Sequence, residues 1–486
     1  KEKDKVAARY YDNFDFKLKV KKFNIVNGLL MPDLMISPNT TIDGSFDASK
    51  DNLKIDVNSE KITYKNYVVK NYKINSFSLD HGIQLAMMAD RINISDSSFI
   101  GNFKVTTLGY DNKTDFKLEW DNQTNLKNKG NINGKVQFSK NSMDMELDKF
   151  GVFLDDSLWT MSGEDHFSVD SAGVMNFHEL VFVNGMQSIK LEGIISHNPK
   201  DPLEIVLDNF MLNQLNPFLK GANLSLDGLI SGTSNLSDIY NNAVFSSALE
   251  FNRLFINNRS IGNGEVNSYY DKAKDLISLN GVFKKDMTNL GNSNLNNLQF
   301  SGYYYPKKDS NNIDIDVKFH SIDLAIIQPY VKGILTIGRG YLSGDAKVTG
   351  SVNKPLLNGK LAFEGVRNLK VDYLNTNYSV NGDIKIEPDR ISLEGVSLFD
   401  VNGNTATLWG NVFHDNFKNL KLDFDINATK FMCLNTNIAL NSAYYGKAFV
   451  TGTVGVYGSP ENMSMEINVK TEKGTQFNIP LSGPAE

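Results

Sequence analysis

The chain has 486 residues, of which 41% are hydrophobic and 22% charged, a composition typical of a folded protein rather than a disordered or fibrous one. Its length exceeds the ~250–300 residues at which one compact core stops growing, so it predicts either several domains or a repeat body. The net charge of −6, without a basic run, argues against nucleic acid as a partner. The longest apolar stretches, such as 82–89, are far shorter than the ~18–20 residues of a membrane-spanning helix.

Strict alternation of apolar and polar residues, typical of a strand with one dry face, recurs along the whole chain. In chain order the clearest runs are residues 14–20, 53–57, 143–147, 313–319, 420–426 and 463–469. Asn-Gly or Asp-Gly pairs, which permit the positive φ of tight hairpins, predict turns at 27–28, 43–44, 184–185, 280–281, 381–382 and 402–403. One-sided alternation between such turns predicts antiparallel strands.

Two short helices are predicted within this strand pattern, at 211–220 and 323–332, with Asp323 as the N-cap of the second. A proline limits each helix to a turn or two, and Gly221 and Gly333 suit the positive φ that ends a helix. The apolar helical faces consist of Leu212, Leu215 and Leu219 in the first copy and Leu324, Ile327 and Val331 in the second.

The two helical segments belong to an internal repeat. Residues 217–221 match 329–333, and the same offset of 112 residues carries Gly228 onto Gly340 and Gly232 onto Gly344. A weaker copy at an offset of 108 places Gly452 and Gly458 after Gly344 and Gly350. A period near a hundred residues predicts one continuous repeat-built β body over 1–486, with loose boundaries near 205, 320 and 430. We interpret the chain as a fragment of a longer protein.

The predicted fold class is all-β: an elongated, lengthwise-curled antiparallel sheet, shaped as a groove or taco, with a few short helices. Too few helices are predicted to cover the apolar face of such a sheet, so the sheet either curls around an apolar groove or closes into one sandwich per repeat. The inward-facing apolar residues are predicted to include Ile313, Ile315, Val317, Phe319, Leu420, Leu422, Phe424 and Ile426. The helices then either cross the open seam of the groove or plug the end of a sandwich.

A family resemblance comes from three stretches, at 205–235, 320–365 and 440–482. The run from Tyr444 through Gly452 to Pro460, followed by 471–481, resembles the translocation and assembly module subunit TamB, of the AsmA-like group and in a Bacteroidota-type form. The segment 215–219 and the glycines after it are similar to that family's repeats. The resemblance implies a periplasmic body anchored to the inner membrane by a segment outside this chain. Its implied partners are phospholipid acyl chains and an outer-membrane Omp85-type assembly protein, the latter reached through a part not present here.

No catalytic constellation is evident in the sequence, so we predict no enzyme, no catalytic residue, no cofactor and no metal site. No two of the six histidines lie three to five residues apart, as a helical metal pair requires. His166 follows Glu164 and Asp165, a cluster that we interpret as a polar loop. Cys433 is the only cysteine and is interpreted as a small core residue.

Three classes of function fit these features. The first is a conduit that carries phospholipid between the inner and outer membranes along the groove. The second is a scaffold that assists outer-membrane protein assembly by pairing its sheet edges with client strands. The third, a surface adhesin, is disfavoured because the repeats are diverged and no Asp-rich calcium loop is present.

Overall fold

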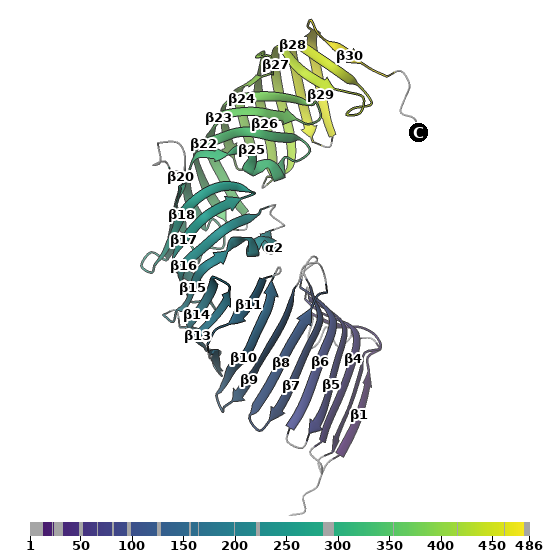
Figure 1. The fold of residues 1–486 in the computed structure, drawn as a ribbon, viewed down its shortest axis with the longest axis vertical. Coiled ribbons are helices and arrows are strands. Elements are labelled where there is room, and N and C mark those ends of the chain that lie inside the picture. Colours follow the sequence, from purple (N-terminus) through teal and green to yellow (C-terminus); the bar gives the residue numbers. More distant parts are fainter. Residues whose placement is uncertain are drawn as a thin grey trace, which may run out of the picture. The chain divides into compact units, whose positions relative to one another are not determined.

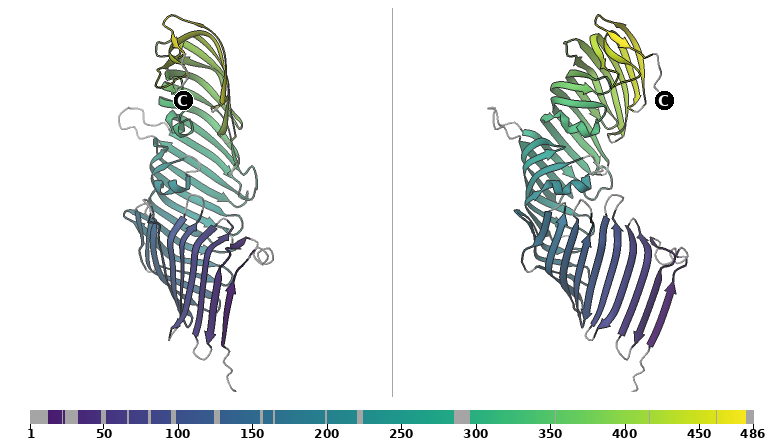
Figure 2. Two further views of the ribbon diagram at one scale, coloured as in Figure 1. Left: turned by 90° about the vertical axis from the view of Figure 1, so that its right-hand side faces the viewer. Right: turned by 45° about the vertical axis from the view of Figure 1, so that its right-hand side comes forward.

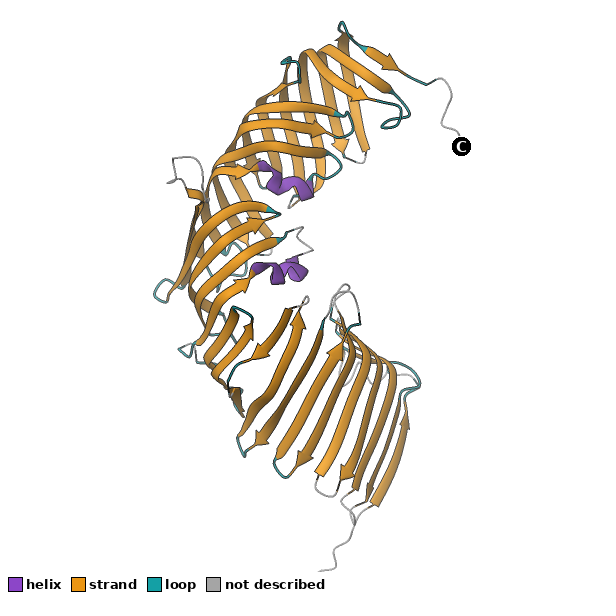
Figure 3. Cartoon of the chain, viewed as in Figure 1, coloured by secondary structure: helices purple, strands orange, loops and turns teal. Residues whose placement is uncertain are grey.

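A computed structural model describes residues 13–21, 23, 33–47, 52–65, 67–79, 82–94, 99–123, 128–154, 157–163, 165–198, 200–219, 224–284, 296–352, 354–415, 417–460 and 462–480. The chain divides into two compact units: unit 1 is 1–208 with 237–241, and unit 2 is 209–236 with 242–486. The described residues form 30 strands, and every strand pairing given below is antiparallel (Figure 1). The predicted all-β class, with a curled antiparallel sheet and a few short helices, is confirmed (Figure 3).

Unit 1 contains the first fourteen strands and most of the fifteenth. Their bounds are β1 Asn13–Lys19, β2 Leu34–Ile36, β3 Thr41–Asp47, β4 Asn52–Tyr64, β5 Tyr67–Leu79, β6 Gly82–Asn93, β7 Phe99–Tyr110, β8 Lys113–Asp121, β9 Lys129–Phe138, β10 Ser142–Leu154, β11 Ser157–Met161, β12 Asp165–Asp170, β13 Met175–Asn184, β14 Gln187–Ile195 and β15 Leu203–Met211. From β3 to β10 each strand pairs with the next along the chain. This simple meander follows from the short connections between the strands.

Unit 2 begins near the end of β15 and contains the short helices. Their bounds are η1 Leu212–Leu215, α2 Asn216–Leu219 and η3 Leu324–Tyr330. The strands are β16 Leu226–Ser237, β17 Val244–Ile256, β18 Arg259–Asp271, β19 Leu276–Lys284, β20 Asn296–Tyr304, β21 Ile313–Asp323, β22 Leu335–Ser351, β23 Lys354–Val371, β24 Thr376–Glu387, β25 Arg390–Phe399, β26 Thr405–Asp415, β27 Lys418–Thr436, β28 Tyr445–Ser459, β29 Asn462–Thr471 and β30 Gln476–Asn478. Figure 2 shows these strands bending, so that the sheet of unit 2 is curled rather than flat.

The six predicted alternating runs all fall in strands, namely β1, β4, β10, β21, β27 and β29, except that Val20 lies just beyond β1. The predicted short helices are also present, and the Asp323 side chain accepts a hydrogen bond from the Ala325 backbone N–H at 2.9 Å, as expected of an N-cap. Gly333 has the expected positive φ of 82°. Gly221 lies outside the described residues.

Three of the predicted glycine turns are wrong. Residues 184–185 and 402–403 do form turns, whereas 43–44, 280–281 and 381–382 lie inside β3, β19 and β24, and 27–28 lies outside the described residues. A methyl group on Gly281 would lie 2.3 Å from the ring of Phe300, its partner on the neighbouring strand. Gly44 is related in the same way to the ring of Phe16. These glycines therefore make room for a cross-strand aromatic ring rather than for a reversal of the chain.

The sheet of unit 2 is creased where a residue with positive φ recurs at equivalent positions of the repeat, and in β21 and β27 this residue lies in a β-bulge. Asn209, Ser321 and Lys430 have φ of 49°, 50° and 52° within β15, β21 and β27. The backbone N–H of each donates to a hydroxyl on another strand, Ser231 at 2.8 Å, Ser343 at 2.8 Å and Thr451 at 2.9 Å respectively. Ile322 and Phe431, which follow two of these bulges, are buried. Because a bulge bends its strand and increases the local twist, a repeated bulge curls the sheet along one line.

The glycines that define the sequence repeat follow these hydroxyl residues. Gly232, Gly344 and Gly452 have φ of 134°, 147° and 141°. A methyl group on each would lie only 2.1–2.3 Å from a carbonyl oxygen of the adjacent strand. No other residue fits this backbone approach, which explains why the glycines recur at offsets of 112 and 108 residues.

The best-buried part of unit 2 lies beside this crease. One cluster joins Leu324 and Ala325 of η3 to Ile337, Val366, Val380 and Val396 of four strands. A second cluster consists of Tyr378, Ala406, Ala428, Phe431 and Val450. The core is therefore supplied by the sheet's own curl and by one short helix, without a second sheet among the described residues of unit 2.

Candidate functional site

The two predicted groups of inward-facing residues lie in the same cross-strand rows. Val317 and Leu422 belong to one row of directly opposed residues, and Phe319 and Phe424 belong to the next. The first row runs from β17 to β29 as Leu249, Val266, Gly281, Phe300, Val317, Ala346, Gly359, Ile386, Ile391, Val412, Leu422, Gly458 and Met463. Every member is apolar or glycine, so the apolar face is continuous across these strands.

Unit 1 carries an apolar row of its own. From β1 to β10 the opposed residues are Leu18, Ile42, Val57, Ile74, Met87, Val105, Leu118, Ile132 and Phe150. Most of its members are half-buried, while Leu18 on β1 is exposed. Both units therefore present the kind of face that an apolar ligand requires.

The opposite face of the sheet in unit 2 is polar. Adjacent to the row of Val317 lies a row of Gln299, Lys318, Asp345, Lys360, Lys385, Ser392, Asn411, Asp423, Tyr457 and Ser464. All eight residues predicted to face inward are half-buried, whereas their neighbours Lys318, Lys421, Asp423 and Asp425 are exposed. The alternation therefore separates a dry face from a wet face.

The connecting helix η3 packs against the apolar face. Leu324 is 4% exposed and contacts the cluster of Val366, Val380 and Val396. Leu212 of η1, at the equivalent position, is 3% exposed. Three residues later, however, Leu215 and Ile327 are 38% and 37% exposed. Each connector thus has one anchoring leucine and one uncovered apolar side chain at the same repeat position; Leu219 and Val331 are half-buried.

A side-chain amide fastens each connector to the strand that follows it. Asn216 accepts from the Leu226 backbone N–H at 2.7 Å and donates to the Leu226 carbonyl at 3.0 Å. Gln328, 112 residues later, accepts from the Ile337 N–H and donates to the Leu335 carbonyl, both at 2.8 Å. Each amide therefore takes the place of one pair of backbone hydrogen bonds between neighbouring strands. Sequence reasoning missed this role, and the only local sign of it is an amide residue that precedes a proline in both copies.

We expect Gln328→Ala to destabilise unit 2 by roughly 1–3 kcal/mol, because two part-buried backbone groups lose their partner. Gln328→Glu should be no more stable than Gln328→Ala, since its carboxylate still accepts from Ile337 but places a charged oxygen against the Leu335 carbonyl oxygen. Urea unfolding of the two variants measures the difference. Equal stability of Gln328→Ala and the unsubstituted chain would show that the amide contributes nothing.

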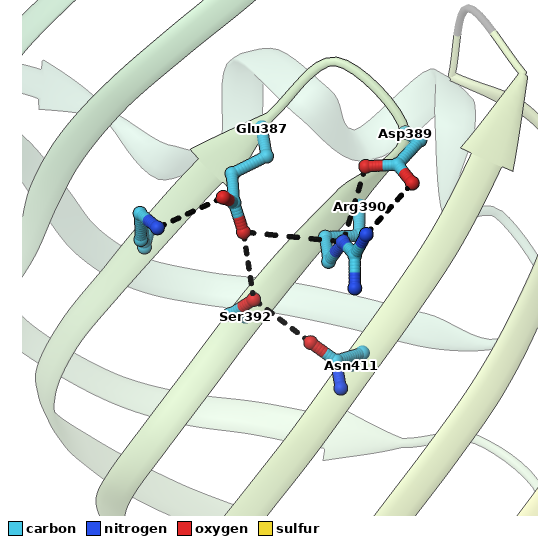
Figure 4. Close-up of polar contacts among 6 residues, drawn as sticks. Glu387, Asp389, Arg390, Ser392 and Asn411 are labelled. Carbon is cyan, nitrogen blue, oxygen red and sulfur yellow. Dashed lines mark hydrogen bonds and ion pairs between the residues drawn. The ribbon is translucent and has the colours of Figure 1, made fainter.

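A second polar cluster, on β24 to β26, has no features of a catalytic site (Figure 4). Ser392 hydrogen-bonds to Asn411 at 2.8 Å and to Glu387 at 3.5 Å. The Lys385 ammonium lowers the pKa of Glu387, and the Arg390 guanidinium lowers that of Asp389. Both carboxylates are therefore ionised at neutral pH and are poor general acids. Ser392 is not next to a histidine, so no activated nucleophile is present in this cluster.

His166, which the sequence analysis interpreted as part of a polar loop, lies instead in strand β12. Cys433 is half-buried, and burial raises the pKa of its thiol, which disfavours the reactive thiolate. His414 is buried against the Phe417 ring, and burial lowers its pKa. Among the described residues, no group of three or more His, Cys, Asp or Glu side chains is arranged to hold a metal ion. His81 and Glu164 lie outside the described residues.

Comparison with known protein families shows which family the chain belongs to. The family described as TamB, N-terminal domain, matches residues 13–363. The chain belongs to the TamB family. TamB-family proteins are associated with the cell envelope, take part in membrane biogenesis with outer-membrane assembly components, and are not enzymes. Neither the curated proteins nor the solved structures gave a match.

The match includes both helical connectors and the strands of the apolar face up to Phe363. Among the described residues of this TamB-family chain, no helix is both long and apolar enough to cross a bilayer.

Proposed function

We propose that this chain is a lipid-conduit segment that carries phospholipid between the inner and outer membranes through the periplasm. The observation that carries this proposal is the continuous row of apolar residues and glycines from β17 to β29, most of which are half-buried and over which the described residues place no second layer. Acyl chains have the chemistry to cover such a face, since each apolar group removed from water contributes roughly 25 cal/mol per Å². The eight inward residues then form the lipid-contacting floor of a groove.

The connectors support the same proposal. Leu215 and Ile327 stay uncovered at equivalent positions although Leu212 and Leu324 beside them are buried. An acyl chain lying along the apolar face beneath a connector would cover them. Together with Leu219 and Val331, these residues would form a roof over the groove at one point of each repeat. In this proposal the protein is anchored to the inner membrane and acts with an Omp85-type partner at the outer membrane.

We expect a benzophenone attached at Leu215→Cys or Ile327→Cys, in a Cys433→Ser background, to crosslink to copurifying phospholipid. Val317→Cys should crosslink as the groove-floor control, and Lys318→Cys, on the outer face of the same strand, should not. Mass spectrometry of the adducts measures both. Crosslinking at 317 without any at 215 or 327 would reduce the connectors to structural plugs, and no crosslinking at any position would refute the conduit.

The alternative function, a scaffold that pairs with client strands, is favoured by one observation. Among the described strands, β29 pairs only with β28, and its apolar residues Met463, Met465 and Ile467 are exposed. An open edge of this kind is a template for β-strand addition. Met465→Lys and Ile467→Lys should abolish capture of an alternating apolar peptide but leave lipid crosslinking at Val317→Cys intact. If the two substitutions left peptide capture intact but abolished lipid crosslinking, the conduit alone would be favoured.

A further inference from the structure

Three cations form one cross-strand row on β4, β5 and β6, which lie side by side in unit 1 (Figure 1). Lys61 is the direct partner of Lys70, and Lys70 is in turn the partner of Arg91. All three side chains are exposed. The adjacent row on the same strands is apolar and half-buried, and consists of Ile62, Val69 and Ile92. The three cations therefore lie on the polar face of the sheet.

This arrangement is unfavourable by itself, because like charges directly opposite each other destabilise a sheet. For comparison, Lys17 on β1 is opposed by Asp43 on β3 and forms an ion pair with it at 3.4 Å. In the part of the chain that the structure describes, no carboxylate forms an ion pair with the three cations, although Glu60 and Asp90 are their neighbours along the strands. Asp90 instead accepts a hydrogen bond from the Asn71 amide at 2.7 Å. The row thus carries positive charge that an external anion would compensate.

The guanidinium at one end of the row is held in position. The Arg91 Nε donates to the Asn93 Oδ1 at 2.7 Å, and the Arg91 Cζ lies 3.7 Å from the centroid of the Phe99 ring. Among the described residues, neither terminal nitrogen of this guanidinium has a hydrogen-bond acceptor. Both are available to the oxygens of a phosphate, whose geometry suits the fork of an arginine.

The hairpin between β4 and β5 adds aromatic side chains to the same end of the sheet. Tyr64 and Tyr67, three residues beyond Lys61 and Lys70 on their strands, are direct partners and are 48% and 50% exposed. The exposed ammonium of Lys65 lies 5.5 Å from the centroid of the Tyr64 ring. Tyrosine rings beside lysine and arginine are typical of a membrane interface, where the rings lie among the lipid headgroups and the cations contact phosphates.

We propose that this end of unit 1 binds the surface of an anionic lipid bilayer. Lys61, Lys70 and Arg91 contact lipid phosphates, and Tyr64 and Tyr67 lie among the headgroups. An extended surface suits the cations because they are exposed and in line, spanning about 10 Å over three strands at ~4.8 Å per strand, rather than gathered around a cavity. The three cations lie on the face opposite the apolar row, so this inference does not depend on the proposed function.

Sedimentation of the 486-residue chain with lipid vesicles tests the proposal. The chain should bind vesicles of phosphatidylglycerol and phosphatidylcholine in equal parts at least about tenfold more tightly than vesicles of phosphatidylcholine alone. The combined variant Lys61→Gln, Lys70→Gln and Arg91→Gln should bind the anionic vesicles roughly a hundredfold more weakly, about fivefold for each cation. Equal binding of the unsubstituted chain to both kinds of vesicle would overturn the proposal.

The matched control removes the same charge from three exposed lysines of unit 1 that are already paired with carboxylates. It is the combined variant Lys17→Gln, Lys54→Gln and Lys117→Gln. This control should lose less than about threefold in affinity, because its lysines are engaged within the sheet. An equal loss in both triple variants would show that only the net charge of the chain matters, and would overturn the assignment to this row.

A measurement on the unsubstituted chain covers the case in which a variant fails to fold. Anionic vesicles should slow the acetylation of Lys61 and Lys70, read out by mass spectrometry of the peptides, and should leave that of the exposed Lys418 in unit 2 unchanged. Glycerol phosphate without vesicles is the second arm. Protection by glycerol phosphate and none by vesicles would assign the row to a soluble phosphate ester and overturn the membrane contact, as would a lack of protection in both arms.

Discussion

Val317→Asp or Phe424→Asp is expected to abolish lipid binding while the chain stays folded. Both residues are half-buried members of the apolar rows on β21 and β27. In an open groove the carboxylate can stay partly hydrated, so the free energy of unfolding should fall by no more than about 2 kcal/mol. An acyl chain cannot lie against the same charge. Lipid mass spectrometry and urea unfolding on the same preparations measure the two effects.

The matched control is Lys318→Asp, which places the same side chain on the outer face of the same strand, where residue 318 is exposed. It should leave both lipid content and stability unchanged within about 0.5 kcal/mol. If the inner variants unfold and lose lipid together, the face is a closed core, because an isolated charge in a closed core costs an amount comparable with the ~5–15 kcal/mol that stabilises a domain. If the unsubstituted chain carries no lipid, the conduit is also wrong.

Asp400→Ala is expected to cause the largest loss of stability in unit 2, roughly 3–5 kcal/mol. The Asp400 carboxylate is buried and accepts backbone hydrogen bonds from Asn402 at 2.8 Å, Asn404 at 2.9 Å and Met432 at 2.9 Å. It therefore ties the turn between β25 and β26 to the bulge in β27. Hydrogen–deuterium exchange over 400–404 and 428–436, together with urea unfolding, measures the loss.

Two further variants separate the causes of that loss. Asp400→Asn keeps one acceptor oxygen for the turn but turns an N–H toward the Met432 N–H, so it should be of intermediate stability. Asp389→Ala removes an exposed carboxylate whose partner is the adjacent Arg390, and it should change stability by less than about 0.5 kcal/mol. Equal stability of Asp400→Ala and Asp389→Ala would mean that the hydrogen bonds from the turn and from β27 to Asp400 do not contribute to the free energy of unfolding.

The sequence was a good guide to strands and a poor guide to their turns. An alternating run such as 420–426 specifies a two-faced strand locally, because side chains alternate whatever the neighbouring strand is. A glycine does not by itself specify whether the chain turns or continues as a strand. Gly281 and Gly403 both follow an asparagine, yet only Gly403 turns the chain, since Gly281 accommodates the Phe300 ring of its neighbour.

In the candidate site, too, some features could be predicted from the sequence and others could not. Val317 and Leu422 could each be predicted to face inward, but their membership of one row depends on the register of the intervening strands. The helices at 212–219 and 324–330 were predictable from their leucine spacing and prolines. The sequence could not predict that Leu215 and Ile327 are exposed while Leu212 and Leu324 are buried. Their exposure depends on which strands pack beneath each helix.

By itself the sequence determined the all-β class, the antiparallel pairing, the hundred-residue repeat and the absence of local catalytic motifs, because these follow from periodicity and spacing within short stretches. Only the tertiary structure decided the continuous apolar rows, the creases at Asn209, Ser321 and Lys430, and the alignment of Lys61, Lys70 and Arg91 in one row. The physical reason is register: a shift of one residue between two strands moves every side chain to the opposite face, and hydrogen bonds between strands, rather than any local pattern, set that shift.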